Sequence, residues 1–468
     1  MKAIAQKSVT TWLLVCSIAM LGIISCRKEL KPDPAATVLD DASTGNNKNE
    51  HGHLQQAKTY SSEVAISWIN KQLDMLRAPL PAGTGAQAQE RCMAYCGIAL
   101  YEAVVPGMPA YQSLYGQLTD FPAMPSTEPG RAYHWAACAN AALAAMNRKL
   151  FPTTAQVNKD AMTHLEDSLQ AVYAGEVDGA TLDRSVTFGR EVASRVFAWA
   201  STDGTAQIAL MPAYVAPAPT AEHPGWWIPT APTPAVNPYA YLRRILTPGA
   251  ADGTTLEPPP TYSTVPHSEF WEMAMDTYNK RNHSTADQQD AVRYAWDPGY
   301  GPGGGFIAIL AQTLNKAKPM LDVAALAYAK VGIAQSDATI ICFIDKYNLN
   351  FNLIRPLTYI NKYIDASWTT QIPTPNHPEF PSGHSTINPA VLAMFTDVFG
   401  DNFQLTLHTY DYLGYPPRSY NSFEEISIDL ANSRVYAGLH YQATCDKSRV
   451  IGKKIAANIL AKLKFLKD

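Results

Sequence analysis

The sequence predicts an all-α fold with a core of helical bundles, best described as two packed four-helix bundles. Apolar residues recur at helical spacing over long segments, whereas the alternating pattern of β-strands is almost absent. Prolines follow several of these segments, as expected where helices end. With 468 residues, 47% of them hydrophobic, the chain can bury a large core in more than one helical layer.

The predicted helices follow one another along most of the chain. The first, 62–77, has a single apolar face and is ended by Pro79. The second, 89–105, is largely apolar and is ended by Pro106, so it should be buried. Further helices are expected over 131–150, 158–174, 182–200, a stretch from about residue 269, 286–295 and 323–347.

A proline-rich segment interrupts this pattern between about Pro212 and Pro260. It contains a dozen prolines, which exclude helix interiors, together with tryptophans and tyrosines, which argue against disorder. We therefore expect a long ordered loop excursion across the surface. Long loops of this kind in otherwise well-packed proteins usually serve function.

The N-terminal sequence predicts an export signal followed by a lipid-attachment site. Lys2 and Lys7 precede an apolar run over 12–24, too short to span a bilayer, and Ser25 then precedes Cys26. We expect residues 1–25 to be a lipoprotein signal peptide and Cys26 to be lipidated, although an ordinary secretory peptide would have the same beginning. The chain would then be exported and anchored to the membrane in a Gram-negative cell envelope, at the periplasm or the outer membrane.

Residues 26–58 are polar and contain few apolar side chains, so we expect a flexible tether. The rest, 59–468, should form one helical domain. The whole chain has a formal net charge of -4. It therefore lacks the basic excess that is typical of a protein that binds nucleic acid. Cys92 and Cys96 lie one helical turn apart; a metal or redox pair is conceivable, but their apolar neighbours favour core packing.

Three short clusters in the last third of the chain carry groups suited to an oxyanion. They are Lys346 with Arg355 and Pro356; Pro381, Ser382, Gly383 and His384; and Ser433 with Arg434 and His440. Arginine offers a planar fork of donors that matches oxyanion geometry, and glycine allows the backbone to approach an anion. Two histidines allow one ring to bond a central atom while the other moves protons. Each residue alone could be structural, but that reading does not explain why all occur together in this order.

These clusters resemble the signature of the superfamily that joins type 2 phosphatidic-acid phosphatases, bacterial acid phosphatases and vanadium haloperoxidases. The signature region here spans 346–446. The resemblance extends to the run from Ile98 to Met108 and to the end of the proline-rich segment at Pro258 to Tyr262, which are similar to a bacterial haloperoxidase-like branch. It therefore covers most of the chain after the tether.

The resemblance implies a role for each site residue. His440 would be the residue bonded to vanadate, or the nucleophile that receives a phosphoryl group, and His384 would be the general acid and base. The residues that would hold the oxyanion are Lys346, Arg355, Ser382, Gly383 and Arg434. His377, seven residues before His384, occupies a position that is aromatic or His in haloperoxidases, although it could equally be a plain loop histidine.

Three departures from the signature put parts of this assignment in question. Lys346 lies nine residues before Arg355 rather than seven, so it reaches the site only if the backbone around 348–352 is irregular. Thr444 stands where the family often has an Asp that orients the last His, and Asp446 is the nearest substitute. Pro389 follows His384 closely, which favours a helix that begins later than His384.

Three functions remain open at this point. The first is a vanadate-dependent haloperoxidase that oxidises bromide or iodide with hydrogen peroxide, and it is favoured because the chain is longer than soluble acid phosphatases of this type. The second is a phosphatase that cleaves a phosphate ester through a phospho-histidine, without vanadate. The third is a degenerate surface binding protein. The haloperoxidase resemblance also makes a homo-oligomer an expectation.

Overall fold

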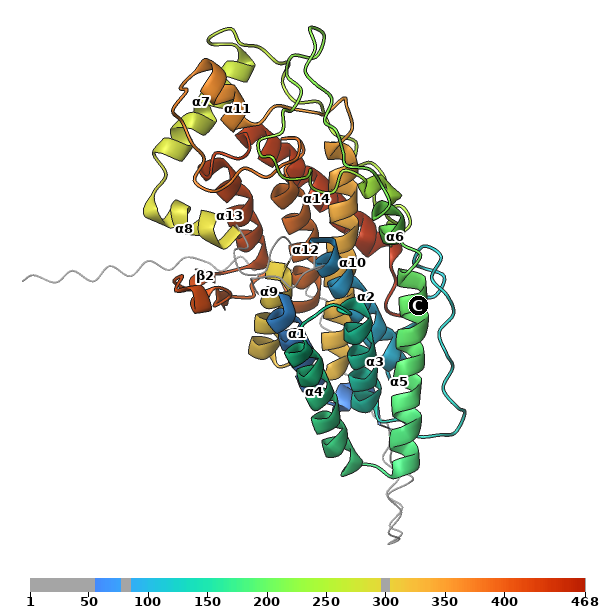
Figure 1. Cartoon of the computed structure of the whole chain (residues 1–468). Helices are drawn as coiled ribbons and strands as arrows, with labels where there is room; N and C mark the ends of the chain where they lie inside the picture. Colours follow the sequence, from blue (N-terminus) through green and yellow to red (C-terminus); the bar gives the residue numbers. More distant parts are fainter. Residues whose placement is uncertain (1–54, 77–85, 296–303, 468) are drawn as a thin grey trace, which may run out of the picture. The chain divides into compact units, whose positions relative to one another are not determined.

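Helices dominate the architecture, which confirms the predicted fold class (Figure 1). The computed structural model describes residues 55–76, 86–295 and 304–467. Within these residues the chain forms fourteen α-helices, a few short 3-10 helices and one two-stranded sheet. The predicted helices are all present, with ends that shift by a few residues.

The α-helices span Glu63–Leu76 (α1), Ala86–Val104 (α2), Trp135–Leu150 (α3), Gln156–Ala174 (α4), Gly179–Ala200 (α5), Thr205–Ile208 (α6), Glu269–Asn282 (α7), Ala286–Ala295 (α8), Gly304–Ala317 (α9), Leu321–Lys346 (α10), Pro356–Tyr363 (α11), Gly383–Phe399 (α12), Phe423–Tyr436 (α13) and Gln442–Lys462 (α14). The 3-10 helices are Ala57–Thr59 (η1), Val105–Gly107 (η2), Ala240–Leu242 (η3) and Asp411–Leu413 (η4). Strands β1 (Leu405–Leu407) and β2 (Arg418–Tyr420) pair antiparallel, with Thr406 opposite Ser419.

Helix α10 joins two groups of helices. It packs against α2, which also contacts α3 and α5, and against α12, which also contacts α13 and α14. Its sequence is apolar on nearly all sides, as expected for a helix buried on all sides. Gly332 allows the close crossing of α10 and α2, because a Cβ there would lie 2.5 Å from the carbonyl oxygen of Met93. The two groups agree with the predicted pair of bundles, and the signature residues lie at the end of α10 and in the second group.

The proline-rich segment is an ordered loop, as predicted. Its backbone binds the two irregular segments that carry site residues. The amide of Trp227 donates to Asn352 Oδ1 at 2.8 Å, and the amide of Val236 donates to the Asn376 carbonyl at 3.0 Å. The loop therefore holds the chain before Arg355 and the chain around His377 in place.

Two expectations about boundaries are corrected. Helix α12 begins at Gly383 despite Pro389, because the side chain of Ser382 caps it by accepting from the Ser385 amide, and Pro389 removes only one hydrogen bond within the helix. The fold also begins before residue 59: the carbonyl of Gln55 accepts from Trp135 Nε1 at 2.9 Å.

The predicted signal peptide, Cys26 and most of the tether lie outside the described residues, so these expectations remain predictions. Among the helices that the structure describes, none is long and apolar enough to cross a membrane. The five described cysteines, which include Cys92 and Cys96, are buried and form no disulfide with one another, in keeping with core packing.

Gly452 allows α12 and α14 to pack closely against each other. A Cβ on Gly452 would lie 2.1 Å from the carbonyl oxygen of Thr386, which is backbone and cannot rotate away. We expect Gly452→Ala to lower the free energy of unfolding by about 1–3 kcal/mol because the two helices must separate. Gly179→Ala, in the first turn of α5 with open space around it, should not destabilise the protein. Chemical denaturation of both variants tests this, and equal effects would contradict it.

Candidate oxyanion site

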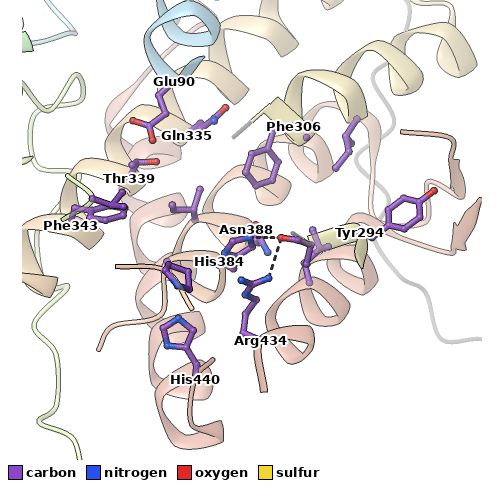
Figure 2. A pocket seen from close by; sticks show the side chains of 18 of the residues that line it. Glu90, Tyr294, Phe306, Gln335, Thr339, Phe343, His384, Asn388, Arg434 and His440 are labelled. Carbon is purple, nitrogen blue, oxygen red and sulfur yellow. Dashed lines mark hydrogen bonds between the residues drawn. The ribbon is translucent and has the colours of Figure 1, made fainter. Parts of the chain in front are cut away.

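Several of the predicted site residues lie at a cavity of about 170 Å³ (Figure 2). Five of them line it: His377, Gly383, His384, Arg434 and His440. The other walls are mainly apolar and aromatic, and include Phe306, Ile309, Phe343, Leu407 and Tyr410. Polar side chains, among them Glu90, Gln335, Thr339 and Asn388, interrupt these apolar walls away from the histidines and Arg434.

His440 is held in one tautomer by two neighbours. Arg355 lies 3.2 Å from its Nε2, and because a guanidinium only donates, Nε2 must accept. The ring proton is therefore on Nδ1, which donates to Glu379 Oε1 at 3.0 Å. Nε2 consequently carries the lone pair, which is the form that bonds a central atom or attacks one.

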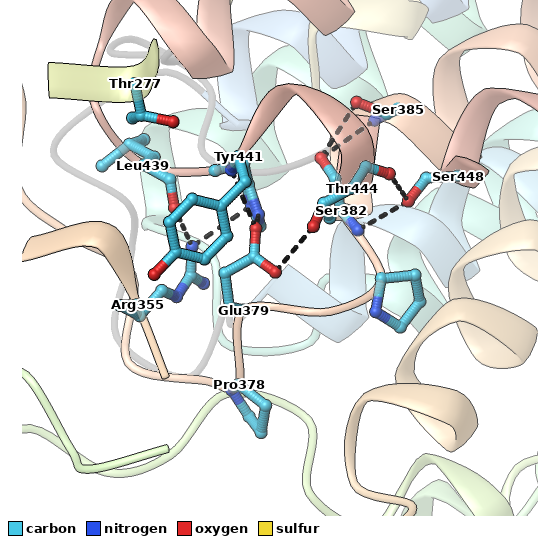
Figure 3. Close-up of polar contacts among 12 residues, drawn as sticks. Thr277, Arg355, Pro378, Glu379, Ser382, Ser385, Leu439, Tyr441, Thr444 and Ser448 are labelled. Atoms are coloured by element: carbon cyan, nitrogen blue, oxygen red, sulfur yellow. Dashed lines mark hydrogen bonds and ion pairs between the residues drawn. The ribbon is translucent and has the colours of Figure 1, made fainter. Parts of the chain in front are cut away.

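Glu379 accepts several hydrogen bonds from the segment that carries His440, and Figure 3 shows it beside Tyr441 and Thr444. Its carboxyl group also accepts from the amide of Tyr441 at 3.1 Å and from the hydroxyl of Thr444 at 2.9 Å. The side chain is fully buried. Three donors thus fix the carboxyl group, which in turn fixes the imidazole of His440.

Arg355 is completely buried directly behind the cavity. It donates from Nε to the His377 carbonyl at 2.9 Å and from one terminal nitrogen to the Leu439 carbonyl at 2.8 Å. The other terminal nitrogen donates to His377 Nδ1 at 2.8 Å. The guanidinium therefore places His377 and His440 relative to one another.

Lys346 is the last residue of α10, and the chain after it is irregular up to Arg355. The interruption expected around 348–352 is therefore present. The lysine ammonium is buried and donates to the carbonyls of Pro378 and Pro381. Its Cε lies 4.0 Å from the position that a Cβ on Gly383 would occupy. The structure thus brings Lys346 against the start of α12, despite the nine-residue spacing.

The start of α12 presents backbone to the cavity. Gly383 lines the wall, and apart from Lys346 Cε nothing would lie within 4 Å of a Cβ there. The first amides of a helix carry positive potential, so an anion is favoured at this point. Ser382, in contrast, does not line the cavity: it is fully buried, and its hydroxyl accepts from Ser385 as the helix cap.

His384 and Arg434 share one acceptor. His384 Nε2 donates to the Ala295 carbonyl at 2.7 Å, and Arg434 donates to the same oxygen at 3.2 Å (Figure 2). Both side chains line the cavity. The end of α8 therefore holds the imidazole and the guanidinium together at the cavity wall.

Burial and clustered positive charge shift the proton affinities of the site. Burial, reinforced by the charges of Arg355 and Lys346, lowers the pKa of His440 and of His377 well below the ordinary value. Burial and Arg434 do the same to the pKa of His384. Burial lowers the pKa of Lys346 to about 7. All three imidazoles are therefore neutral at neutral pH.

The lowered pKa of His377 gives a pH-dependent stability. Because the pKa of His377 is lowered in the folded state, the unfolded chain takes up a proton at this residue more readily than the folded protein does as the pH falls below 6.5. Its stabilising contribution is therefore present above pH 6.5 and is lost as the pH falls toward the folded pKa. Between pH 6.5 and 5, we expect the free energy of unfolding of the vanadate-free wild type to fall by up to about 1.4 kcal/mol per pH unit more than that of His377→Phe. Denaturant unfolding across this range measures the difference, and parallel curves would contradict it.

One predicted site residue is wrong in position, and one was missed. Asp446 is exposed on α14 and accepts from Gln442 at 3.0 Å, so it does not orient His440. Glu379 contacts the ring instead. A signal for Glu379 existed: it is the one charged residue in the proline-rich stretch 373–381, directly before Ser382. A charge in such a buried setting needs a partner.

The residues present fit a vanadate or phosphate group. Three buried basic side chains, Lys346, Arg355 and Arg434, lie close enough to lower the pKa of His440, which contacts the carboxyl group of Glu379. Buried charge of one sign is costly unless it is paired, so an anion would complete the cluster. The space beside Gly383 and the lone pair on His440 Nε2 suit a central atom surrounded by oxygens.

Comparisons with known proteins relate the sequence and the fold to vanadium-dependent enzymes. The sequence profile of the VCPO second helical-bundle domain matches residues 362–467, which include His384, Arg434 and His440. The crystal structure of a bacterial vanadium-dependent iodoperoxidase is similar with a TM-score of 0.77 and 29% identity, covering 87% of this chain and 98% of that chain.

A bacterial vanadium-dependent chloroperoxidase in its holo form shares the fold with a TM-score of 0.61 and 14% identity, covering 83% of this chain and 94% of that chain. Its apo form is similar with a TM-score of 0.59 and 14% identity, covering 82% and 96%. Among curated proteins, no sequence matches this chain. The domain match over residues 362–467 and the fold shared with the 29% identical iodoperoxidase support the resemblance of this chain to the vanadium haloperoxidase superfamily.

Proposed function

We propose that this protein is a vanadate-dependent haloperoxidase that oxidises iodide or bromide with hydrogen peroxide. The observation that carries the proposal is the fixed tautomer of His440, whose Nε2 lone pair lies beside Arg355. That arrangement offers a neutral nitrogen ligand to an oxyanion surrounded by cations. When bound, vanadate would supply the electrophilic activation of peroxide toward a halide.

The chain would contribute binding, orientation and proton movement. His440 Nε2 would hold the central atom, while Arg355 and Arg434 would donate to its negatively charged oxygens. The amides at the start of α12 would add donors at Gly383. Arg355 would have to transfer its hydrogen bond from His440 Nε2 to the anion, whereas the buried contacts described above fix the other groups, so little further reorganisation is needed when charge develops.

His384 is proposed as the group that moves protons. Its ring donates to the Ala295 carbonyl from Nε2, so this tautomer carries its lone pair on Nδ1. The low pKa of His384 keeps this nitrogen unprotonated at neutral pH, as a proton acceptor requires. An anion bound nearby would raise that pKa and allow the same ring to return the proton.

The expected substrates are hydrogen peroxide and a halide. The 29% identical relative is named an iodoperoxidase, which supports iodide. His377 lines the cavity at a position where the resemblance implies a His in bromide-oxidising haloperoxidases, which supports bromide as well. Assays of iodide and bromide oxidation with and without orthovanadate test the proposal. Vanadate-dependent turnover is the expected result.

The same assays separate the alternatives. Hydrolysis of a phosphate ester by vanadate-free protein, inhibited by vanadate and without halide oxidation, would replace the proposal with a phosphatase. Absence of both activities would favour a degenerate binding protein. Both results would overturn the haloperoxidase proposal.

A further inference from the structure

Asn388 is a buried polar residue on the cavity wall that the oxyanion cluster does not use. It lies one helical turn after His384 on α12, and both residues line the cavity (Figure 2). Its side chain is only 2% exposed. Within the residues that the structure describes, Nδ2 has no hydrogen-bond partner. A buried donor left without an acceptor is unfavourable, so the position calls for an acceptor inside the cavity.

The surroundings of Asn388 define the chemistry of that acceptor. Arg434 lines the same cavity, and its positive charge favours an anion. Phe306 and Ile309, in contrast, are apolar wall residues that cannot replace a tightly held hydration shell. Glu90 also lines the cavity, but its carboxyl group is paired with Arg243. The cost of removing an ion from water falls as its radius grows, so a large, weakly hydrated anion fits the unpartnered Asn388 amide beside these apolar side chains.

The size of the cavity limits what else can occupy it. Its volume of about 170 Å³ is close to the roughly 150 Å³ of an apolar cavity that encloses one benzene molecule. A five-atom oxyanion at the cationic end would take a large part of this space. The remainder suits a monatomic ion better than a second ring-sized molecule.

We propose that Asn388 and the apolar wall facing it form the halide subsite, with a preference for iodide over bromide and for bromide over chloride. The inference rests on the proposed haloperoxidase function and names its halide-binding residue. Residues four apart on a helix have Cβ atoms about 5–6 Å apart, so a halide held by Asn388 lies next to His384 and the oxyanion position. Asn388 would thus be a specificity-determining residue that positions the halide.

Anomalous diffraction from iodide-soaked crystals of the vanadate-free protein tests the subsite without turnover. We expect an iodine peak within contact distance of Asn388 Nδ2 in the wild type. The peak should be absent in Asn388→Leu, which keeps the approximate shape but removes the donor. An iodine peak elsewhere in the cavity, or no peak in the wild type, would overturn the proposal even if the variant failed to fold.

Kinetics provide the second readout. In Asn388→Leu and in Asn388→Asp, which has nearly the same shape but adds negative charge, the KM for iodide should rise at least about tenfold. The kcat at saturating iodide, the KM for peroxide and the affinity for vanadate should change little. The control Asn315→Leu makes the same replacement at an exposed position on α9 and should leave all four values unchanged. An unchanged KM for iodide in both Asn388 variants would contradict the proposal.

Two outcomes distinguish failure of the halide subsite from failure of the haloperoxidase function. Halide oxidation without an iodine peak at Asn388 would remove the subsite and leave the haloperoxidase function intact. An iodine peak at Asn388 without vanadate-dependent halide oxidation would remove the function and leave an anion site.

Discussion

His440→Ala is expected to lower vanadate-dependent halide oxidation by at least about a thousandfold, because it removes the only group proposed to bond the central atom. The change also leaves Arg355 Nη1 and Glu379 Oε1 without their contacts to the ring, at 3.2 Å and 3.0 Å in the wild type. We therefore expect some loss of stability as well, and activity must be compared under conditions in which the variant is folded.

The control for this prediction is His164→Ala. His164 is exposed on α4, far along the chain from the signature, and its contact with Ser168 is a weak one at 3.4 Å. It should retain wild-type kcat and vanadate affinity. Steady-state iodide oxidation with added orthovanadate measures both variants. If folded His440→Ala kept more than a tenth of the wild-type kcat, His440 would not be the vanadate ligand.

Glu379→Gln should weaken vanadate binding by about 10–100-fold, the usual effect of losing the partner that orients a ligand histidine. Glutamine keeps the shape but presents an amide, so His440 Nδ1–H no longer faces a carboxylate and the tautomer is less firmly fixed. The residue acts by positioning His440 rather than by touching the substrate. Calorimetric titration with orthovanadate measures the affinity.

The pH dependence of stability, together with a matched control, distinguishes the positioning role of Glu379 from general damage to the fold. Burial raises the pKa of Glu379 to about 7, so its contribution to stability is complete below pH 4.5 and is lost as the pH rises through 7. The wild type should therefore lose stability relative to Glu379→Gln between pH 4.5 and 7. Glu166→Gln is the matched control, since Glu166 is also buried and bound by arginines but lies on α4. Equal losses of vanadate affinity in both variants would show that the effect is not specific to His440.

The helices could be predicted because their signals are local. Apolar periodicity and a following proline defined the segment 62–77, which became α1. The start of α12 was harder, because Pro389 suggested a later beginning than Gly383. The cap by Ser382 and packing of α12 against α10 and α14 outweigh the single hydrogen bond that the proline removes.

The site could be predicted in part. Arg355, Arg434, His384 and His440 were found by type and order, and they do gather at one place. Their contacts with more distant segments were not predictable from spacing. Glu379 reaches His440 across 61 positions of sequence because the segment before α12 folds back against the start of α14.

Asp446 failed as a prediction for a geometric reason. Helix α14 begins at Gln442, and four residues later Asp446 projects from its exposed side beside that residue.

Lys346, in contrast, lies against the start of α12 despite its unfavourable spacing. Its spacing from Arg355 places it away from the site on an ideal helix, but α10 ends at Lys346 and the following irregular segment removes the constraint.

The central claim is that vanadate binds at His440, and locating vanadium in crystals by anomalous diffraction tests it most directly. The predicted result is one vanadium peak per chain at bonding distance from His440 Nε2, flanked by Arg434 and the start of α12, and absent in His440→Ala. A vanadium peak without contact to His440, or crystals saturated with orthovanadate that contain no vanadium in this cavity, would contradict the account.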